Sequence, residues 1–325
     1  MTDYLTHTAC DIDKVPKRAL KGHDGVEDML QQYIVQLKFD GVCGVLVHTP
    51  ENSTFLTRTG EGIQSCGHVV EALAATPFDF LSSNSTSYSQ QYKYGVYIGE
   101  LWHPTMSFPD ISGAARLHQP DERSRQLQFV VCDFLTLEEY SAGKSDLGFL
   151  DRIERIAWMQ DIYHPDDGGE FVDPTVKPNA PPIWFAGHEG CVADQAAVTI
   201  DDLAREACDS GNYDGIICRK ADGGWKRGAR DENIVKVKPL LSLDLRIIGT
   251  EEGKGKHAGR IGAIIVDYKG KPCRVGTGLS DADRERDDLV GQIAEVRAMS
   301  ESSKGLLREP RLKGLRFDTR PEGEK

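Results

Sequence analysis

The sequence predicts an α+β protein with antiparallel sheets in a large first domain and a small barrel of the OB type in a second. Apolar runs flank a tight Asp40-Gly41 turn, as the two strands of a β-hairpin would. From about residue 241, several short strand-like runs and one helix-like run follow one another, a pattern that suits a small OB-type barrel. We therefore expect two domains, residues 1–240 and residues 241–325.

The net charge of the chain indicates which classes of binding partner to expect. The 325 residues carry a formal net charge of −12, which argues weakly against nucleic-acid binding, because such proteins usually show a basic footprint. The charge is uneven, however, since residues 241–325 contain 17 Lys and Arg against 15 Asp and Glu. A basic surface local to one cleft is compatible with the acidic total, because binding depends on the local field.

Cysteine usage and the N-terminal sequence indicate the compartment. The eight cysteines form no Cys-x-x-Cys pair, and several lie in apolar runs, so we expect reduced, buried thiols rather than disulfides or zinc ligands. The chain does not open with a basic segment followed by an apolar core, and no apolar run approaches the length that spans a membrane. These features predict a cytoplasmic protein without a membrane partner.

Periodicity and turn signals predict the remaining elements. Helices are expected at 26–32, 69–75, 147–159, 199–209 and 283–299. Strands are expected at 53–61, 94–102, 128–135, 183–185, 213–220, 233–239, 243–248, 260–268, 273–276 and 311–317. The stretch 161–182 is rich in Pro, Asp and Gly and is expected to be a loop.

Lys38 stands at the end of the first hairpin strand, directly before the turn. A lysine becomes a covalent nucleophile only when its amine loses its proton, which burial or nearby positive charge favours. The Val, Ile and Leu residues of the strand supply the first condition, and cations from elsewhere in the chain supply the second. Taken alone, a lysine before an Asp-Gly turn is more often a solvated hairpin end.

Other charged residues lie within apolar strands. Glu100 sits among Ile98, Leu101 and Trp102 and needs a partner, because an unpaired buried charge is costly. That partner is either a core arginine, water at a strand end, a ligand hydroxyl or a metal. Lys236 and Lys238 project to one face of their strand, where they either bind an anion or protect an exposed edge against aggregation.

Taken in order, several segments resemble the nucleotidyltransferase superfamily of ATP-dependent DNA ligases, RNA ligases and mRNA capping enzymes. The compact two-domain DNA ligases of bacteriophages are the most similar members. The resemblance covers most of the chain and rests on these segments: Lys38-Phe39-Asp40-Gly41, Thr57-Arg58-Thr59-Gly60, Ile98-Gly99-Glu100-Leu101, Phe129 to Phe134, Asp214 to Arg219, Trp225-Lys226-Arg227-Gly228 and Val235 to Pro239. It implies an ATP-grasp-like nucleotidyltransferase domain followed by an OB-fold domain.

The resemblance also implies an activity, the sealing of nicks in duplex DNA by an ATP- and Mg²⁺-dependent monomer during replication, repair and recombination. Lys38 would attack the α-phosphate of ATP, form lysyl-AMP and pass the AMP to a 5′-phosphate. Nucleotide-binding positions would be Gln36, Leu37, Phe39, Arg58, Glu100, Phe134, Ile216, Lys236 and Lys238, and the metal ligands would be Glu100 and Asp214.

Three positions depart from the family pattern. Cys43 stands where an arginine usually contacts phosphate, Ile98 where an acid usually stands, and Cys132 where an aromatic ring usually stacks on adenine. Phe134 or Ile216 would then take over the stacking. Two alternatives therefore stay open: an RNA ligase or capping-type guanylyltransferase, and a nucleic-acid-binding homologue with weakened catalysis.

Overall fold

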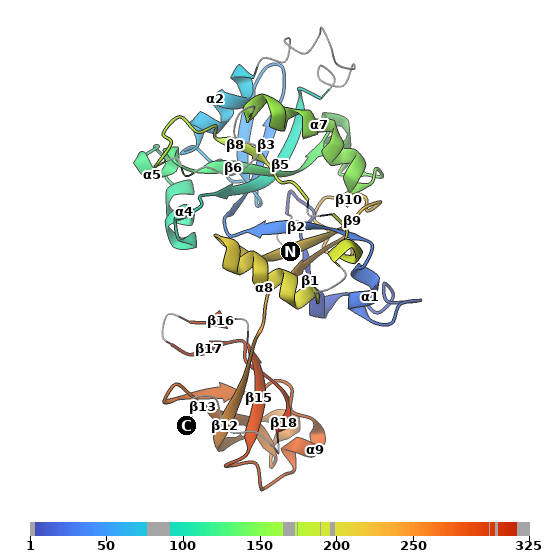
Figure 1. The fold of residues 1–325 in the computed structure, drawn as a ribbon, viewed down its shortest axis with the longest axis vertical. Coiled ribbons are helices and arrows are strands. Elements are labelled where there is room, and N and C mark those ends of the chain that lie inside the picture. The colour runs from blue at the N-terminus through green and yellow to red at the C-terminus, as the bar shows by residue number, and fades with distance from the viewer. Residues whose placement is uncertain are drawn as a thin grey trace. The chain divides into compact units, whose positions relative to one another are not determined.

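The chain folds into two compact units, Met1–Val237 and Lys238–Lys325, shown in Figure 1. The structure, a computed structural model, describes residues 4–76, 92–164, 173, 175–188, 190–195, 199–298, 300–302 and 305–316. Much of the loop expected at 161–182 and residue 317 of the last expected strand lie outside these ranges. Among the described residues, no helix is long and apolar enough to cross a membrane.

Two sheets organise the first unit. The strand order of one is β1 (Cys10–Asp11), β11 (Ile234–Val237), β9 (Tyr213–Lys220) and β2 (Tyr33–Phe39). The strand order of the other is β4 (Ser53–Thr57), β3 (Val42–His48), β5 (Gly95–Trp102), β6 (Gln128–Leu135) and β8 (Ile183–Phe185). All neighbouring strands are antiparallel except the pairs β1–β11 and β6–β8. We call the first sheet, which carries Lys38 on β2, the lysine sheet, and the second, which carries Glu100 on β5, the glutamate sheet.

Short elements complete the first unit. The helices are α1 (Val26–Leu30), α2 (Gly67–Ala75), α4 (Phe108–Ala115), α5 (Glu122–Arg125), α6 (Leu137–Ala142), α7 (Phe149–Tyr163) and α8 (Ile200–Ser210), with 3-10 turns at Ile12–Lys14 and Val192–Gln195. A two-stranded ribbon pairs β7 (Lys144–Ser145) with β10 (Trp225–Lys226). The start of α8 follows from sequence, because the Thr199 hydroxyl accepts a hydrogen bond from the backbone N–H of Asp202 in a capping box.

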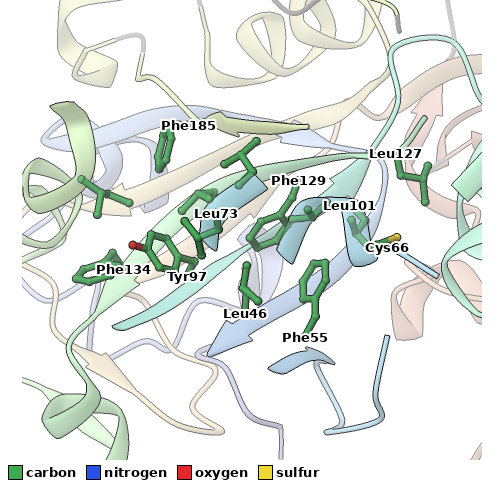
Figure 2. Close-up of a cluster of buried hydrophobic side chains, with 14 of the residues drawn as sticks. Leu46, Phe55, Cys66, Leu73, Tyr97, Leu101, Leu127, Phe129, Phe134 and Phe185 are labelled. Atoms are coloured by element: carbon green, nitrogen blue, oxygen red, sulfur yellow. The ribbon is translucent and has the colours of Figure 1, made fainter. Parts of the chain in front are cut away.

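The glutamate sheet buries one face beneath α2 and α7. Alternate residues of its strands point to this face, so Tyr97, Leu101, Phe129 and Phe134 pack against helical side chains such as Leu73 in one hydrophobic cluster (Figure 2). The lysine sheet likewise buries one face against α1 and α8. The two sheets meet in a further cluster, where Phe39 of β2 packs with Trp102 of β5 and Trp184 of β8, and the candidate site lies beside it.

The second unit is built on an antiparallel sheet with the order β14 (Lys271–Val275), β13 (Ile261–Tyr268), β12 (Leu241–Glu252), β15 (Ile293–Ala298) and β18 (Arg311–Arg316). Its other elements are a 3-10 turn at Gly255–His257, α9 (Asp281–Arg284) and the hairpin of β16 (Ser300–Glu301) and β17 (Leu307–Arg308). Thr277, just beyond β14, bridges to Arg311 at the start of β18. The two edges of the sheet therefore approach each other around a shared apolar core, as an OB-type fold requires.

The helix expected at 283–299 is wrong. Only Asp281–Arg284 is helical, and Ile293–Ala298 forms β15 between β12 and β18. Gly291, with φ +93°, ends the turn that precedes the strand. Ile293, Ala294 and Val296 are all buried, because β15 is a central strand, and continuous burial of a short apolar run does not distinguish a strand from a helix.

Candidate active site

Lys38 faces the carboxylate of Asp214 across the lysine sheet. The pairing of β2 with β9 is irregular between Leu37 and Phe39, which are opposite Ile216 and Tyr213. At this irregularity Lys38 Nζ donates a hydrogen bond to Asp214 Oδ2 over 2.7 Å. Both side chains are mostly buried, 20% and 27% exposed, so the ion pair is only partly screened by water.

An aromatic cluster fixes the backbone on either side of this pair. Phe39 meets Trp102 and Tyr213 edge-on, each at 5.3 Å between ring centroids, and Trp102 stacks on Tyr213 at 5.7 Å. The Trp102 indole N–H donates to the carbonyl of Asn212 over 2.8 Å. These contacts join the ends of β2, β5 and β9, so Phe39 acts by holding Lys38 in place.

Gly41 brings the hairpin close to β5. A Cβ atom at this position would lie 2.1 Å from the Leu101 carbonyl oxygen and 2.8 Å from Glu100 Cγ, so no larger residue fits. The glycine of the Lys-x-Asp-Gly motif therefore brings the loop after Lys38 against Glu100. This is a packing reason for the motif, beyond the turn that the sequence predicts.

Glu100 projects from β5 toward the same place. Burial raises the pKa of its carboxyl to about 7, against the opposing effect of the Lys38 and Arg58 charges, and Asp40 and Asp214 raise the pKa further. Its strand neighbour is Cys43 on β3. Among the described residues, the arginine whose charge acts on Glu100 is Arg58, which is exposed and is therefore not the core arginine that the sequence left open.

The raised pKa of Glu100 predicts a pH-dependent stability. The folded carboxyl, with pKa about 7 against 4.5 in the reference state, binds its proton more tightly than the unfolded one. This group therefore stabilises the fold fully below pH 4.5, and the contribution is lost as the pH rises through 7. The free energy of unfolding of Glu100→Gln is expected to exceed that of the wild type by about 1–2 kcal/mol at pH 8, a value reduced to allow for the partial exposure of Glu100. The difference should disappear by pH 4.5. Urea unfolding at both pH values measures the gap, and a gap independent of pH would contradict the assignment.

A row of aligned residues crosses the lysine sheet. Gln36, Ile217, Lys236 and Asp11 are successive Cα partners from β2 to β1, so their side chains share one face. Lys38 follows Gln36 at the next position of that face. The pairing of β2, β9 and β11 therefore brings Lys236 to the face that carries Lys38.

Two of these side chains already have protein partners. The Gln36 amide is buried, donates to the carbonyls of Ala186 and Gly187, and accepts from Arg219 Nε over 2.6 Å. Lys236 Nζ lies 2.9 Å from Asp11 Oδ1. Gln36 thus orders the floor of the site, and its amide is not open toward a nucleotide.

Two predicted nucleotide-binding side chains, Phe134 and Ile216, point away from the site. Phe134 is fully buried beneath the helices of the glutamate sheet, where it meets Tyr97 edge-on (Figure 2). Ile216 packs against α8, and its strand partner Leu37 packs both there and against the cluster of Phe39 and Trp102 beside the site. Stacking on a base by Phe134 or Ile216 is therefore corrected, because strand alternation presents the neighbouring Ile217 to the site instead.

The remaining predicted cations lie in different surroundings. Arg58 follows β4, with its guanidinium 4.6 Å from the centroid of the Tyr4 ring, and its charge lowers the pKa of Glu100. Lys238 is the first residue of the second unit. Of Lys236 and Lys238, therefore, only Lys236 belongs to the first unit, which carries Lys38.

All eight cysteines are described and are free thiols; Cys10, Cys66, Cys218 and Cys273 are buried as expected, whereas the other four are only partly buried. Cys43 and Cys132 both feel the charge of Glu100, and burial raises the pKa of the Cys132 thiol to about 12 and that of Cys43 still further. Neither is a reactive thiolate at neutral pH. They provide apolar lining where the family pattern has an arginine and an aromatic ring.

The sequence did not reveal a buried charge network beneath the site. Arg152 on α7 binds both oxygens of Asp133 at 2.9 Å and donates to the carbonyls of Leu147 and Gly223. Arg219 Nη1 lies 3.6 Å from Asp133 Oδ2. Asp133 is the one acid within the expected strand 128–135, and the position of Arg152 on the side of α7 that meets β6 is the signal that would identify its partner.

The protein side chains alone do not form a complete metal site among the described residues, so a bound nucleotide or water would have to supply further metal ligands. Among the described residues, no group of three or more His, Cys, Asp or Glu side chains is arranged to hold an ion. Glu100 and Asp214 are close enough that the charge of one raises the pKa of the other's carboxyl. Two converging carboxylates suit Mg²⁺ when phosphate oxygens and water supply the remaining ligands.

Comparison with solved structures identifies the fold. The chain matches Pmar-Lig_PreS3 with a TM-score of 0.59 and 20% identity, covering 97% of this chain and 67% of that one. It matches the ATP-dependent DNA ligase from bacteriophage T7, solved in complex with ATP, with a TM-score of 0.51 and 18% identity over 96% and 98% of the two chains. The chain therefore has the two-domain DNA-ligase fold.

Sequence comparison also finds similarity to DNA ligases. Residues 252–316 match the DNA ligase OB-like domain family. A DNA ligase of Natronomonas pharaonis is 33% identical over 100 residues, covering 29% of this chain and 17% of that protein. The chain spans less than a third of the length of the curated relatives it matches. These matches confirm the resemblance to DNA ligases and the OB-like second domain.

Proposed function

We propose that this protein is an ATP-dependent DNA ligase that seals nicks in duplex DNA as a monomer in the cytoplasm. The observation that carries the proposal is the Lys38–Asp214 hydrogen bond facing Glu100 within a DNA-ligase fold. Residues 1–240 would act as the adenylation domain and residues 241–325 as the OB domain that helps hold DNA.

Lys38 would begin the reaction. Its Nζ, freed of a proton, attacks the α-phosphorus of ATP; a P–N bond forms, the bond to the β-phosphate oxygen breaks, and pyrophosphate leaves. Asp214 Oδ2, 2.7 Å from Nζ, orients the amine and is within reach to accept its proton. A 5′-phosphate at the nick then takes the AMP from Lys38, and the 3′-hydroxyl displaces AMP as the strand is sealed.

The surrounding charges fit this chemistry. Lys236 and Arg58 carry positive charge to the face where negative charge would grow on the phosphate, and such preorganised charges stabilise transfer. Glu100 would accept a hydrogen bond from a ribose hydroxyl when ionised. With Asp214 it would also hold Mg²⁺, which supplies charge neutralisation on the phosphates. Ile217 and Cys132 offer an apolar surface for the base in place of an aromatic ring.

Intact mass spectrometry tests the proposal. Incubation with ATP and Mg²⁺ is expected to add one AMP to the protein, on Lys38, and pyrophosphate is expected to remove it. Nicked duplex DNA should discharge the AMP and become sealed. Labelling by GTP and not by ATP would favour a capping-type enzyme, discharge only on RNA would favour an RNA ligase, and no labelling by either nucleotide would favour a binding protein.

A further inference from the structure

Residues 4–11 run past several of the motifs that surround Lys38. The backbone N–H of Leu5 donates to the carbonyl of Arg58 over 2.9 Å. Further along, Thr8 exchanges contacts with the 225–231 loop, its N–H donating to the Ala229 carbonyl over 2.8 Å. The segment then ends as β1, paired in parallel with β11. We call residues 4–11 the N-terminal strap.

His7 anchors the strap. Its imidazole is buried, and both ring nitrogens have partners: Nδ1 accepts from the backbone N–H of Lys226, and Nε2 donates to Asp231 Oδ1 over 2.9 Å. Burial lowers the pKa of this histidine, so the ring stays neutral in this arrangement. Thr6 and Thr8, on either side, are buried as well. The strap is therefore part of the packed first unit, with its ends directed toward Arg58 and Lys236.

Asp11 binds the lysine of β11. Asp11 and Lys236 are Cα partners, so both side chains leave the same face of the lysine sheet, and Oδ1 lies 2.9 Å from Nζ. The second oxygen of Asp11 lies 2.9 Å from Lys14 Nζ. Lys236 is 25% exposed, and an unheld lysine of that exposure would sample many rotamers. The Asp11 contact removes that freedom.

Tyr4 provides a similar contact at the other end. Its ring lies under the guanidinium of Arg58 at 4.6 Å, a cation–π distance. Arg58 is otherwise exposed, just beyond β4. The two ends of one segment thus hold two cations that reach the site from different sheets.

We propose that the N-terminal strap sets the directions of the two phosphate-binding cations, with Asp11 as the positioning residue for Lys236 and Tyr4 as the positioning residue for Arg58. This inference rests on the proposed function, since it assigns the strap to the lysyl-AMP step. A preorganised cation stabilises charge on a transferring phosphate without reorganising at the moment of reaction. Small losses of such positioning cost up to about a hundredfold in rate.

The test is a double-mutant cycle on the rate of lysyl-AMP formation under single turnover. Asp11→Asn is expected to slow the step about tenfold with the melting temperature unchanged, while Asp11→Glu, which keeps the carboxylate, recovers most of the rate. Lys14→Gln is the matched control, because it removes the other partner of Asp11, and is expected to stay within about twofold. In a Lys236→Gln background, Asp11→Asn should cause no further loss.

The outcomes separate this inference from the function on which it rests. If the wild type forms no lysyl-AMP, both fail together. If the wild type reacts and Asp11→Asn reacts equally fast or faster, the strap is a spacer or a competitor for Lys236, and only this inference is overturned. An equal slowing in the Lys236→Gln background would likewise overturn it, because Asp11 would then act through the fold.

Tyr4 has an independent readout. Tyr4→Phe keeps the ring and is expected to leave the KM for ATP unchanged, whereas Tyr4→Leu is expected to raise that KM about threefold, the loss of one exposed cation–π contact. Equal values for the two variants would overturn the role of Tyr4.

Discussion

Lys38→Ala is expected to abolish lysyl-AMP formation, by at least about four orders of magnitude, because the atom that would carry the AMP is removed. Lys38 is the lysine that the hairpin, the Phe39 packing and the Gly41 turn place beside Asp214 and Glu100. Lys38→Arg should be equally inactive. It keeps a positive charge for Asp214, but a guanidinium is not deprotonated near neutral pH and offers no free amine.

The controls for this prediction use another lysine of the same sheet. Lys220 lies on β9, and its Nζ pairs with Asp222 over 3.2 Å at the surface, so Lys220→Ala should label as the wild type does. Nicked DNA should still bind Lys38→Ala, because the substitution leaves the backbone of both units unchanged. Undiminished labelling of Lys38→Ala, with the AMP mapped to another residue, would show that the nucleophile lies elsewhere.

Arg152→Met is expected to destabilise the first unit by about 3–5 kcal/mol. The substitution leaves the Asp133 carboxylate buried without its bidentate partner, and removing one member of a buried pair costs about this much. Arg219, 3.6 Å from Asp133, offsets part of the loss. The carbonyls of Leu147 and Gly223 also lose a donor. Urea unfolding of the first unit measures the change.

A surface pair is the matched control. Arg205 and Asp201 are one turn apart on α8 at 2.6 Å, and both side chains are exposed. Arg205→Met should cost less than about 0.5 kcal/mol. The double variant Asp133→Leu/Arg152→Met should regain part of the stability, because it removes the orphaned charge. If Arg152→Met were as mild as Arg205→Met, the buried network would contribute nothing to the fold.

The sequence predicted the residues around Lys38 better than it predicted how they are held. The Asp40-Gly41 turn and the alternation along β11 are local, so the sequence predicted where Lys38 and Lys236 lie on their own strands, whereas their shared face of the sheet follows from the pairing of β2, β9 and β11. The partners of these lysines, Asp214 and Asp11, come from strands far away in the chain, and no local pattern sets that register. Asp214 was foreseen as a metal ligand and not as the residue that binds Nζ.

The errors have a common physical origin. The family resemblance suggests Phe134 or Ile216 for stacking on the base, but each lies one residue away from a position that faces the site, and in a strand one residue reverses the face. The helix expected at 283–299 failed because a fully buried strand shows no alternation. To avoid either error, one must know which faces of a strand are buried, and only the tertiary structure supplies that information.

The order in which the chain is made bears on when this site can exist. Lys38 meets Asp214 across 176 positions, and β1 pairs with β11, the last strand of the first unit. A growing chain therefore lacks the strand that pairs with β2 until β9 has been synthesised, and the sheet is complete only once β11 follows. Such distant pairings are slow to form. The second unit, by contrast, joins β12, β13 and β14 as successive hairpins, so refolding experiments are expected to show it forming first.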